Sequence, residues 1–264
     1  MAQDDPFKLA GEDEIADRKS DELFRYGKHK NIVCVTDKRG SPREDRSELI
    51  EAVRAVAPDP RVEIVVDATE GYIPLWDENV TLRWTLNEVS MKAFSNPAGA
   101  KTAIEALLTE ALSRWGDACP VKFVRDDQRY DFQFAMRSKK RCSPIGCVLA
   151  STFFPDGGQH EFVMYPTLFD EQTYEEQVET FIHELGHVFG LRHFFALISE
   201  TAMPAIIFGK HKKFSIMNYG EESRLTKDDK SDLKRLYEGV WTRKLTALNG
   251  TRFKLMQPSS AKVP

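Results

Sequence analysis

The string HELGHVFGLRH occupies residues 183–193 and carries more information than any other part of the chain. His183 and His187 are four residues apart, so on a helix both imidazoles project from one face and reach a single ion. Gly190 is able to take the left-handed conformation that ends a helix, and the turn returns His193 to the same ion. Three neutral imidazoles leave a tetrahedral zinc with one open position, so the string predicts a catalytic metal site.

Glu184 follows His183 directly, so its carboxylate points beside the metal rather than at it. There it is able to take a proton from a water that the metal activates, which is the role of a general base. Chance explains the string poorly, because five fixed residue types at roughly one in twenty each give on the order of 10⁻⁴ matches per random chain. The alternative is an ordinary helix with unrelated histidines, but half of the 6 histidines of the chain fall in this string.

The string resembles the extended zinc signature of the metzincin metallopeptidases, H-E-x-x-H-x-x-G-x-x-H, which a Met-turn follows. Residues 215–220 read SIMNYG, and Met217 lies 24 residues beyond His193. The resemblance implies zinc as the cofactor, an endopeptidase that hydrolyses peptide bonds, and Met217 as a hydrophobic floor beneath the metal rather than a ligand. The alternative class is an inert, metal-containing binding protein with a degenerate site. The three ligands and the base are all present in the sequence, so nothing supports that alternative.

The stretch from about residue 78 to 240 looks like the catalytic domain of a matrixin, one group of metzincins. ALSRW at 111–115 and PVKF at 120–123 are similar to a matrixin helix and the strand after it, and LTKDD at 225–229 resembles the start of the closing helix. Two features depart from the matrixin pattern. Phe194 replaces the serine that is usual after the third histidine, and the Met-turn is closer to those of astacins and serralysins.

Tyr219 stands two residues after the methionine of this Met-turn. In astacins and serralysins that tyrosine is an additional zinc ligand that swings to stabilise the oxyanion, so the resemblance implies Tyr219 as a catalytic residue beside Glu184. A packed tyrosine is the alternative. Matrixins often bind structural calcium and a second zinc as well, for which DGGQH at 156–160 is a candidate loop. The full set of secondary ligands is missing there, and a plain surface turn is the preferred interpretation.

Hydrophobic periodicity predicts an α/β (α+β) fold. The metzincin resemblance implies a twisted mixed sheet packed on a long helix and on the zinc-binding helix, with a C-terminal helix after the Met-turn. The main strands are expected at 80–86, 132–136, 148–154 and 162–165. The strand at 148–152 resembles the matrixin edge strand, which binds an extended polypeptide substrate through main-chain hydrogen bonds. The main helices are expected at 97–115, 173–189 and 227–239.

Local signals set the ends of these helices. Asn96 is an N-cap before a proline in the first turn, and Gly116 is expected to stop that helix. Thr226 and Asp229 are spaced as in a capping box. Gly239 is expected to end the third helix.

The chain divides into three parts. Residues 1–75 form an N-terminal extension or a small β-α-β subdomain (strands at 31–36 and 62–66, a helix at 47–53), with a pro-segment left open. Residues 76–240 are the matrixin-like metallopeptidase domain, and residues 241–264 are a tail that either packs back or frays. Cys34 lacks the sequence that surrounds the inhibitory cysteine of matrixin zymogens, so it is interpreted as a buried apolar cysteine.

Composition excludes some classes of function. The net charge is -4, with 41% hydrophobic and 30% charged residues, so there is no electrostatic argument for nucleic acid or an anionic membrane. No stretch approaches the roughly 18 to 20 apolar residues that cross a bilayer. The first residues lack the basic start and apolar core of a secretory signal, and the compartment stays open. Cys142 and Cys147 bracket Ser-Pro-Ile-Gly, where a disulfide and two reduced thiols are both open.

Overall fold

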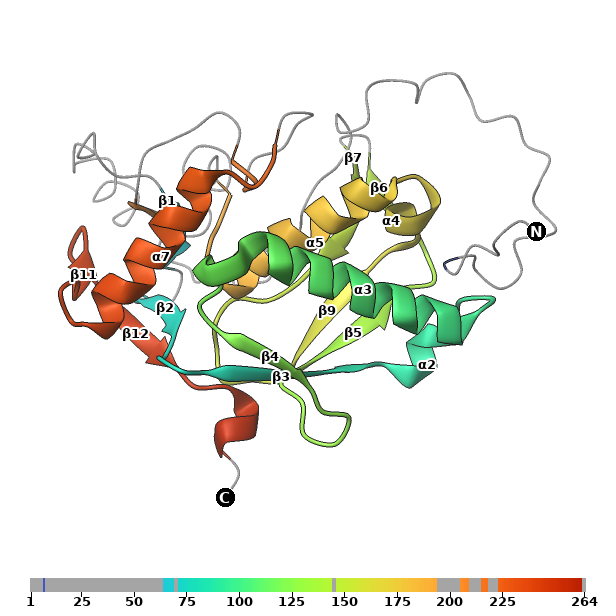
Figure 1. The fold of residues 1–264 in the computed structure, drawn as a ribbon, viewed down its shortest axis with the longest axis horizontal. Coiled ribbons are helices and arrows are strands. Elements are labelled where there is room, and N and C mark those ends of the chain that lie inside the picture. Colours follow the sequence, from blue (N-terminus) through green and yellow to red (C-terminus); the bar gives the residue numbers. More distant parts are fainter. Residues whose placement is uncertain are drawn as a thin grey trace.

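The computed structural model describes residues 7, 64–68, 71–143, 146–193, 205–208, 215–217 and 223–262. Within these residues the fold is the mixed α/β architecture that the sequence predicts, with a twisted mixed sheet and several helices (Figure 1). The expected strand at 31–36 and helix at 47–53 lie outside the described residues. No helix in the described part is both long and apolar enough to cross a bilayer.

The main sheet has the strand order β4-β3-β5-β9-β8. Its strands are β3 (Thr81–Leu86), β4 (Lys122–Arg125), β5 (Phe132–Met136), β8 (Ala150–Ser151) and β9 (His160–Met164). All neighbours pair in parallel except β8, which runs antiparallel to β9 at one edge. The expected single strand over 148–154 is wrong in extent, because the chain changes partner at Leu149, between β7 and β8.

Helix α3 (Pro97–Trp115) begins and ends where the sequence predicts. The Asn96 side chain accepts a hydrogen bond from the backbone N–H of Gly99 at 3.0 Å, and Gly116 ends the helix with φ of 58°. At its last residue, the buried indole of Trp115 donates to the carbonyl of Ile182 at 3.1 Å. This bond joins α3 to the helix that carries the first two histidines of the motif.

That second helix, α5 (Tyr174–Val188), begins with a capping box between Thr173 and Glu176. Its Phe181 ring packs on the main sheet, with its centroid 5.8 Å from that of Phe134 and 4.9 Å from that of Phe162. The sheet and α3 therefore bury most of α5, and Figure 1 shows the two helices lying along the same side of the sheet.

Helix α7 (Lys227–Trp241) has the expected start, with Thr226 and Asp229 forming a capping box. Its expected end at Gly239 is wrong, because the helix continues to Trp241. A Cβ atom at Gly239 would lie 3.2 Å from the Cβ of Leu245, whose backbone N–H donates to the Gly239 carbonyl at 2.8 Å. The glycine therefore permits a close approach of the chain after the helix rather than stopping it.

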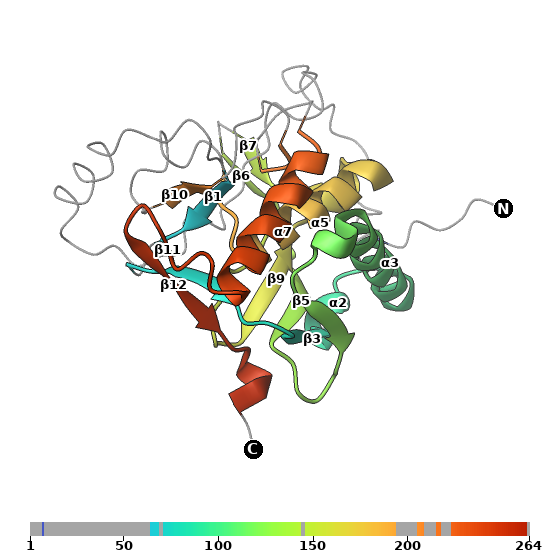
Figure 2. The same cartoon turned by 60° about the vertical axis from the view of Figure 1, so that its left-hand side comes forward.

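The described residues after α7 pack back on the domain. They form β11 (Ala247–Leu248), β12 (Thr251–Met256) and the short 3-10 helix η5 (Ser259–Lys262). β12 pairs in parallel with β2 (Ile73–Trp76), a fully buried strand that the sequence pattern did not indicate (Figure 2). Asp131 accepts hydrogen bonds from the backbone N–H of Ser260 at 2.6 Å and from its hydroxyl at 3.0 Å.

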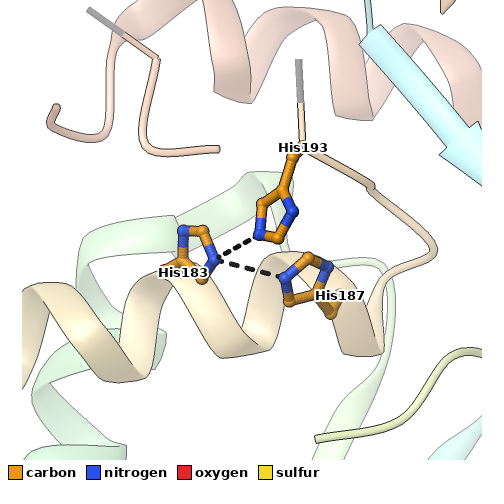
Figure 3. Close-up of side chains that lie close together, drawn as sticks. All are labelled: His183, His187 and His193. Carbon is orange, nitrogen blue, oxygen red and sulfur yellow. Dashed lines mark hydrogen bonds between the residues drawn. The ribbon is translucent and has the colours of Figure 1, made fainter. Parts of the chain in front are cut away.

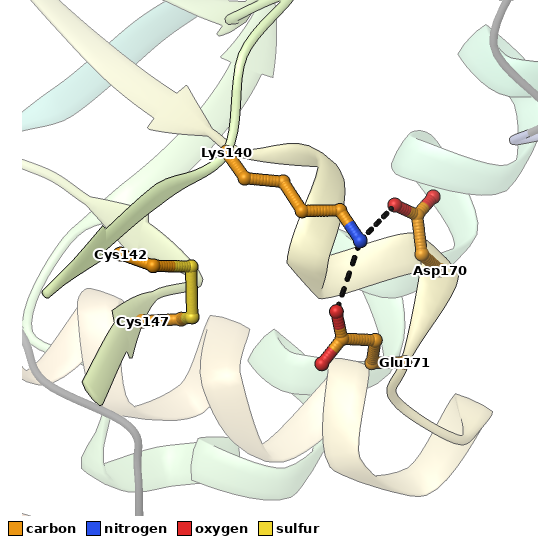
Figure 4. Close-up of a disulfide and its surroundings, with 5 residues drawn as sticks. All are labelled: Lys140, Cys142, Cys147, Asp170 and Glu171. Carbon is orange, nitrogen blue, oxygen red and sulfur yellow. Dashed lines mark hydrogen bonds and ion pairs between the residues drawn. A yellow bond between two sulfur atoms is a disulfide. The ribbon is translucent and has the colours of Figure 1, made fainter. Parts of the chain in front are cut away.

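Two further strand pairs complete the described structure. β1 (Ile64–Asp67), which overlaps the strand expected at 62–66, pairs antiparallel with β10 (Ala205–Phe208). β6 (Arg141–Ser143) and β7 (Gly146–Val148) form a hairpin, in which Cys142 is opposite Cys147 and the two form a disulfide (Figure 4). The shorter helices are α2 (Glu88–Met91), η4 (Gly116–Ala118) and α4 (Pro166–Asp170).

A lysine at the base of the hairpin holds it to α4. The Lys140 ammonium lies 3.0 Å from an Asp170 oxygen and 2.9 Å from a Glu171 oxygen (Figure 4). Burial acts to lower the pKa of Lys140, but its hydrogen bonds to the two carboxylates outweigh burial and raise it. The lysine therefore stays charged and bridges both acids.

Candidate metal centre

The three histidines of the motif converge at one point (Figure 3). The Nε2 atom of His183 lies 3.2 Å from the Nε2 atoms of both His187 and His193. The ligand atoms of all three lie within 4.8 Å of one another. In the described part of the chain they are the one group of three or more metal-ligating side chains with this geometry.

Backbone carbonyls orient two of the three rings. Nδ1–H of His183 donates to the carbonyl of Ile216 at 2.8 Å, and Nδ1–H of His187 donates to the carbonyl of Leu191 at 2.7 Å. Because a carbonyl oxygen only accepts, the proton of each neutral ring is on Nδ1. The lone pair of each Nε2 atom is therefore directed at the shared point, which is the arrangement found at histidine metal ligands.

These residues fit a zinc ion. Two neutral imidazoles whose Nε2 atoms both carry lone pairs cannot donate to each other, so a cation between them accounts for their approach to 3.2 Å. Two nitrogens bound tetrahedrally at about 2.0–2.1 Å from a zinc ion lie roughly 3.3 Å apart. The observed spacing matches that value, and the donor set of three imidazoles is that of catalytic zinc sites.

The third histidine reaches this point through a tight turn after α5. Gly190 has φ of 89°, a left-handed conformation that a side chain would strain. A Cβ atom there would lie 3.1 Å from Cδ2 of Leu75 and 3.2 Å from the carbonyl oxygen of Pro74, both in β2. Gly190 is therefore required for its backbone conformation and for the close packing of β2.

Polar contacts from other elements hold the end of α5. The indole N–H of Trp76 donates to the carbonyl of Val188 at 2.7 Å. The hydroxyl of Tyr237 donates to the carbonyl of Phe189 at 3.1 Å and accepts from the backbone N–H of Trp76 at 3.3 Å. Two carbonyls that the helix end leaves without intrahelical partners thus have donors from β2 and α7.

Glu184 lies on α5 next to the first histidine and is only 2% exposed. Met217 is 1% exposed and packs against the same helix, because a Cβ atom at Gly186 would lie only 2.5 Å from its Sδ atom. Gly186, which the motif leaves unspecified, is thus the position that lets the methionine approach. The sequence pattern did not identify this role of Gly186.

Asp229 connects the segment that contains Met217 to α7. Its carboxylate accepts hydrogen bonds from the Ser215 hydroxyl at 2.6 Å and from the backbone N–H of Thr226 at 2.8 Å. Burial raises the pKa of this carboxyl, although the hydrogen bonds act in the opposite direction. Ile216, next to Ser215, supplies the carbonyl that orients His183. The sequence showed Asp229 as a capping residue only, since its bond to Ser215 joins two separate segments.

Other residues named in the sequence analysis lie either outside the described residues or in the loop at 156–160. Tyr219, Phe194 and Cys34 lie outside the described residues. In the 156–160 loop, His160 Nε2 lies 2.7 Å from Oδ1 of Asp156, and its ring stacks on Phe153. Within the described residues, the loop has no group of three metal-ligating side chains like that of the histidine triad, and calcium or a second zinc there stays untested.

The comparison with protein families agrees with this fold, because it identifies a matrixin, one group of the metzincin zinc metalloendopeptidases. The chain belongs to the matrixin family, whose model matches residues 76–238. It is therefore a hydrolase that cleaves peptide bonds with zinc. No curated protein matches the chain. Among solved structures, the crystal structure of myroilysin is similar at a TM-score of 0.41 and 14% identity, over 62% of this chain and 85% of that chain.

Proposed function

We propose that the chain is an endopeptidase in which His183, His187 and His193 hold the catalytic zinc and Glu184 is the general base. The observation that carries the proposal is the convergence of three Nε2 atoms, with two rings fixed in the tautomer that a metal ligand requires. The membership in the matrixin family supports zinc as the ion.

The bound zinc supplies a Lewis acid that polarises the scissile carbonyl and lowers the pKa of water toward about 7. Glu184 takes the proton of the attacking water and passes it to the leaving amine, so one carboxylate is first base and then acid. The side chain of Glu184 is buried, at 2% exposure. Met217 is a packing residue under the three rings and takes no part in proton transfer.

Tyr219 is proposed as a second catalytic residue, which donates a hydrogen bond to the oxyanion as the reaction proceeds. The support is its position two residues after Met217 in the sequence. A Tyr219→Phe variant keeps the ring and removes only the hydroxyl. We expect it to lower kcat by about ten- to a hundredfold with little change in KM; an unchanged kcat would leave Tyr219 as a packing residue.

The proposed substrate is a polypeptide bound in extended form along β8. This strand is the last in the order of the main sheet and precedes α5 in the chain, so a substrate strand is able to pair beside it. In this proposal residues 76–240 form the metallopeptidase domain, between the 1–75 extension and the 241–264 tail. The family match over 76–238 supports these bounds.

The test is peptide hydrolysis by the wild type and by Glu184→Gln, with the zinc content of both measured. We expect kcat to fall by about 10²–10⁴-fold, the range for loss of a general base, while bound zinc is unchanged. Glu179→Gln is the matched control, because it makes the same change on the same helix at a partly exposed acid. Full activity in Glu184→Gln would contradict the proposed mechanism.

A further inference from the structure

A strand that precedes the family-matched domain pairs with the turn between the second and the third histidine of the motif. The match to the matrixin family begins at residue 76, whereas β1 covers Ile64–Asp67. Val66 of β1 is 0% exposed, is paired with Ile206 of β10 and also forms an antiparallel bridge with Leu191. Val66 therefore links Leu191, which precedes His193, to Ile206, which follows it in the sequence.

Leu191 is the point through which this bridge acts on the metal ligands. Its carbonyl accepts the Nδ1–H bond that orients His187, and its backbone N–H donates to Gly186 at 2.9 Å. It also precedes His193 by two residues. A shift of Leu191 would move its carbonyl away from the His187 ring. It would also change the backbone path that places His193.

The strand that follows, β2, supports the same turn from a second direction. Leu75 and Pro74 pack closely against Gly190, and the indole N–H of Trp76 donates a hydrogen bond to the carbonyl of Val188. All four residues of β2 are buried, and β2 is held in turn by its parallel pairing with β12. Contacts from β1 and β2 thus reach three residues of the turn between the second and the third histidine.

We propose that Val66 and β2 (Ile73–Trp76) are positioning residues of the zinc site and stay in the active enzyme. The proposal rests on the zinc endopeptidase function proposed above. The sequence left open whether residues 1–75 are a removable pro-segment. The contacts favour a different boundary for any such removal, N-terminal to β1, because a cut at residue 75 would strip Val66, Ile73 and Leu75, each 0% exposed, from the core.

The test compares two substitutions in the full chain, Val66→Ala and Val121→Ala. Each removes the same two methyl groups from a buried valine, since Val121 is 6% exposed. Val121 precedes β4, at the edge of the main sheet opposite β8, and within the described residues no backbone hydrogen bond or strand pairing joins it to the turn at 188–191. The control therefore reports what a general loss of core packing does to the site.

Two readouts separate positioning from stability. Zinc affinity is measured by competition with a chelator, and cobalt(II) in place of zinc gives a visible spectrum that depends on the number and geometry of its ligands. We expect Val66→Ala to weaken zinc binding by about tenfold, the low end of the range for residues that orient metal-bound histidines, and to alter the cobalt spectrum. We expect Val121→Ala to match the wild type in both readouts, even where its melting temperature falls.

The outcomes are distinct. Equal zinc affinity and equal cobalt spectra in the two variants, whether unchanged or changed together, would overturn this inference and leave the proposed function intact. A wild-type chain that binds no zinc would overturn the proposed function and this inference with it.

Discussion

The hydroxyl of Ser215 donates a hydrogen bond to Oδ1 of Asp229 over 2.6 Å. This contact joins the segment that contains Met217 to the first turn of α7, since the same carboxylate accepts from Thr226. Ile216, the neighbour of Ser215, orients His183 through its carbonyl. Two hydrogen bonds, one between Ser215 and Asp229 and one between Ile216 and His183, therefore link this carboxylate to a metal ligand.

Asp229→Ala is expected to destabilise the fold. The substitution leaves the donors of Ser215 and Thr226 without their acceptor in a buried setting, which costs about 2–3 kcal/mol of unfolding free energy. Urea unfolding measures this loss. Asp228→Ala is the matched control at the neighbouring acid in the same turn of α7, and an equal loss in both variants would contradict the role given to Asp229.

The stability that depends on Asp229 is expected to fall as the pH rises. Burial raises the pKa of this carboxyl above its ordinary value of 3.8, so between that pH and the raised pKa the unfolded chain binds fewer protons than the folded chain. The free energy of unfolding decreases with rising pH in that window. Relative to Asp229→Asn, the wild type should therefore lose stability from about pH 4 upward and then level off above the raised pKa. Denaturation of both proteins across a pH series checks this, and a difference that grows in favour of the wild type with rising pH would refute it.

Gly186→Ala is expected to displace Met217. Alanine normally stabilises a helix interior by about 1 kcal/mol relative to glycine. Here its Cβ would lie 2.5 Å from the buried Sδ atom of Met217, so the single variant should lose both stability and activity. In a Met217→Ala background the same change should be neutral or stabilising. A double-mutant cycle with thermal unfolding measures the coupling, which we expect to exceed about 0.5 kcal/mol; additive effects would mean that the two residues do not meet.

The disulfide of the β6–β7 hairpin is expected to add local stability only. Closing a loop this short contributes at most about 2 kcal/mol, and the Cys142→Ser/Cys147→Ser variant should keep its zinc affinity. Alkylation of the unfolded, unreduced protein, followed by mass spectrometry of its peptides, should label Cys119 but leave Cys142 and Cys147 unlabelled until a reductant is added. Labelling of all three before reduction would show that the bridge is absent.

Local signals explain what the sequence predicted well. The metal ligands of the site fall within an 11-residue string, so helical spacing and one glycine were sufficient to expect their convergence. Asn96, Thr173 and Thr226 each cap a helix through contacts only three residues away, and the starts of α3, α5 and α7 are confirmed. Tyr219 stays a prediction.

Long-range pairing explains what the sequence did not predict. β2 is four residues long and pairs with β12 at the other end of the chain, as in the register of Ile73 with Phe253. Nothing in either segment specifies the other. Gly239 shows a related limit: a glycine that ends a helix and one that permits a close contact look the same in sequence, and only the position of Leu245 separates them.

Diffraction from crystals of the zinc-loaded protein, recorded on both sides of the zinc absorption edge, tests the shared metal site directly. We predict one anomalous peak at about 2.0–2.1 Å from the Nε2 atoms of His183, His187 and His193. A peak elsewhere, or one within bonding distance of only two of these rings, would contradict the account.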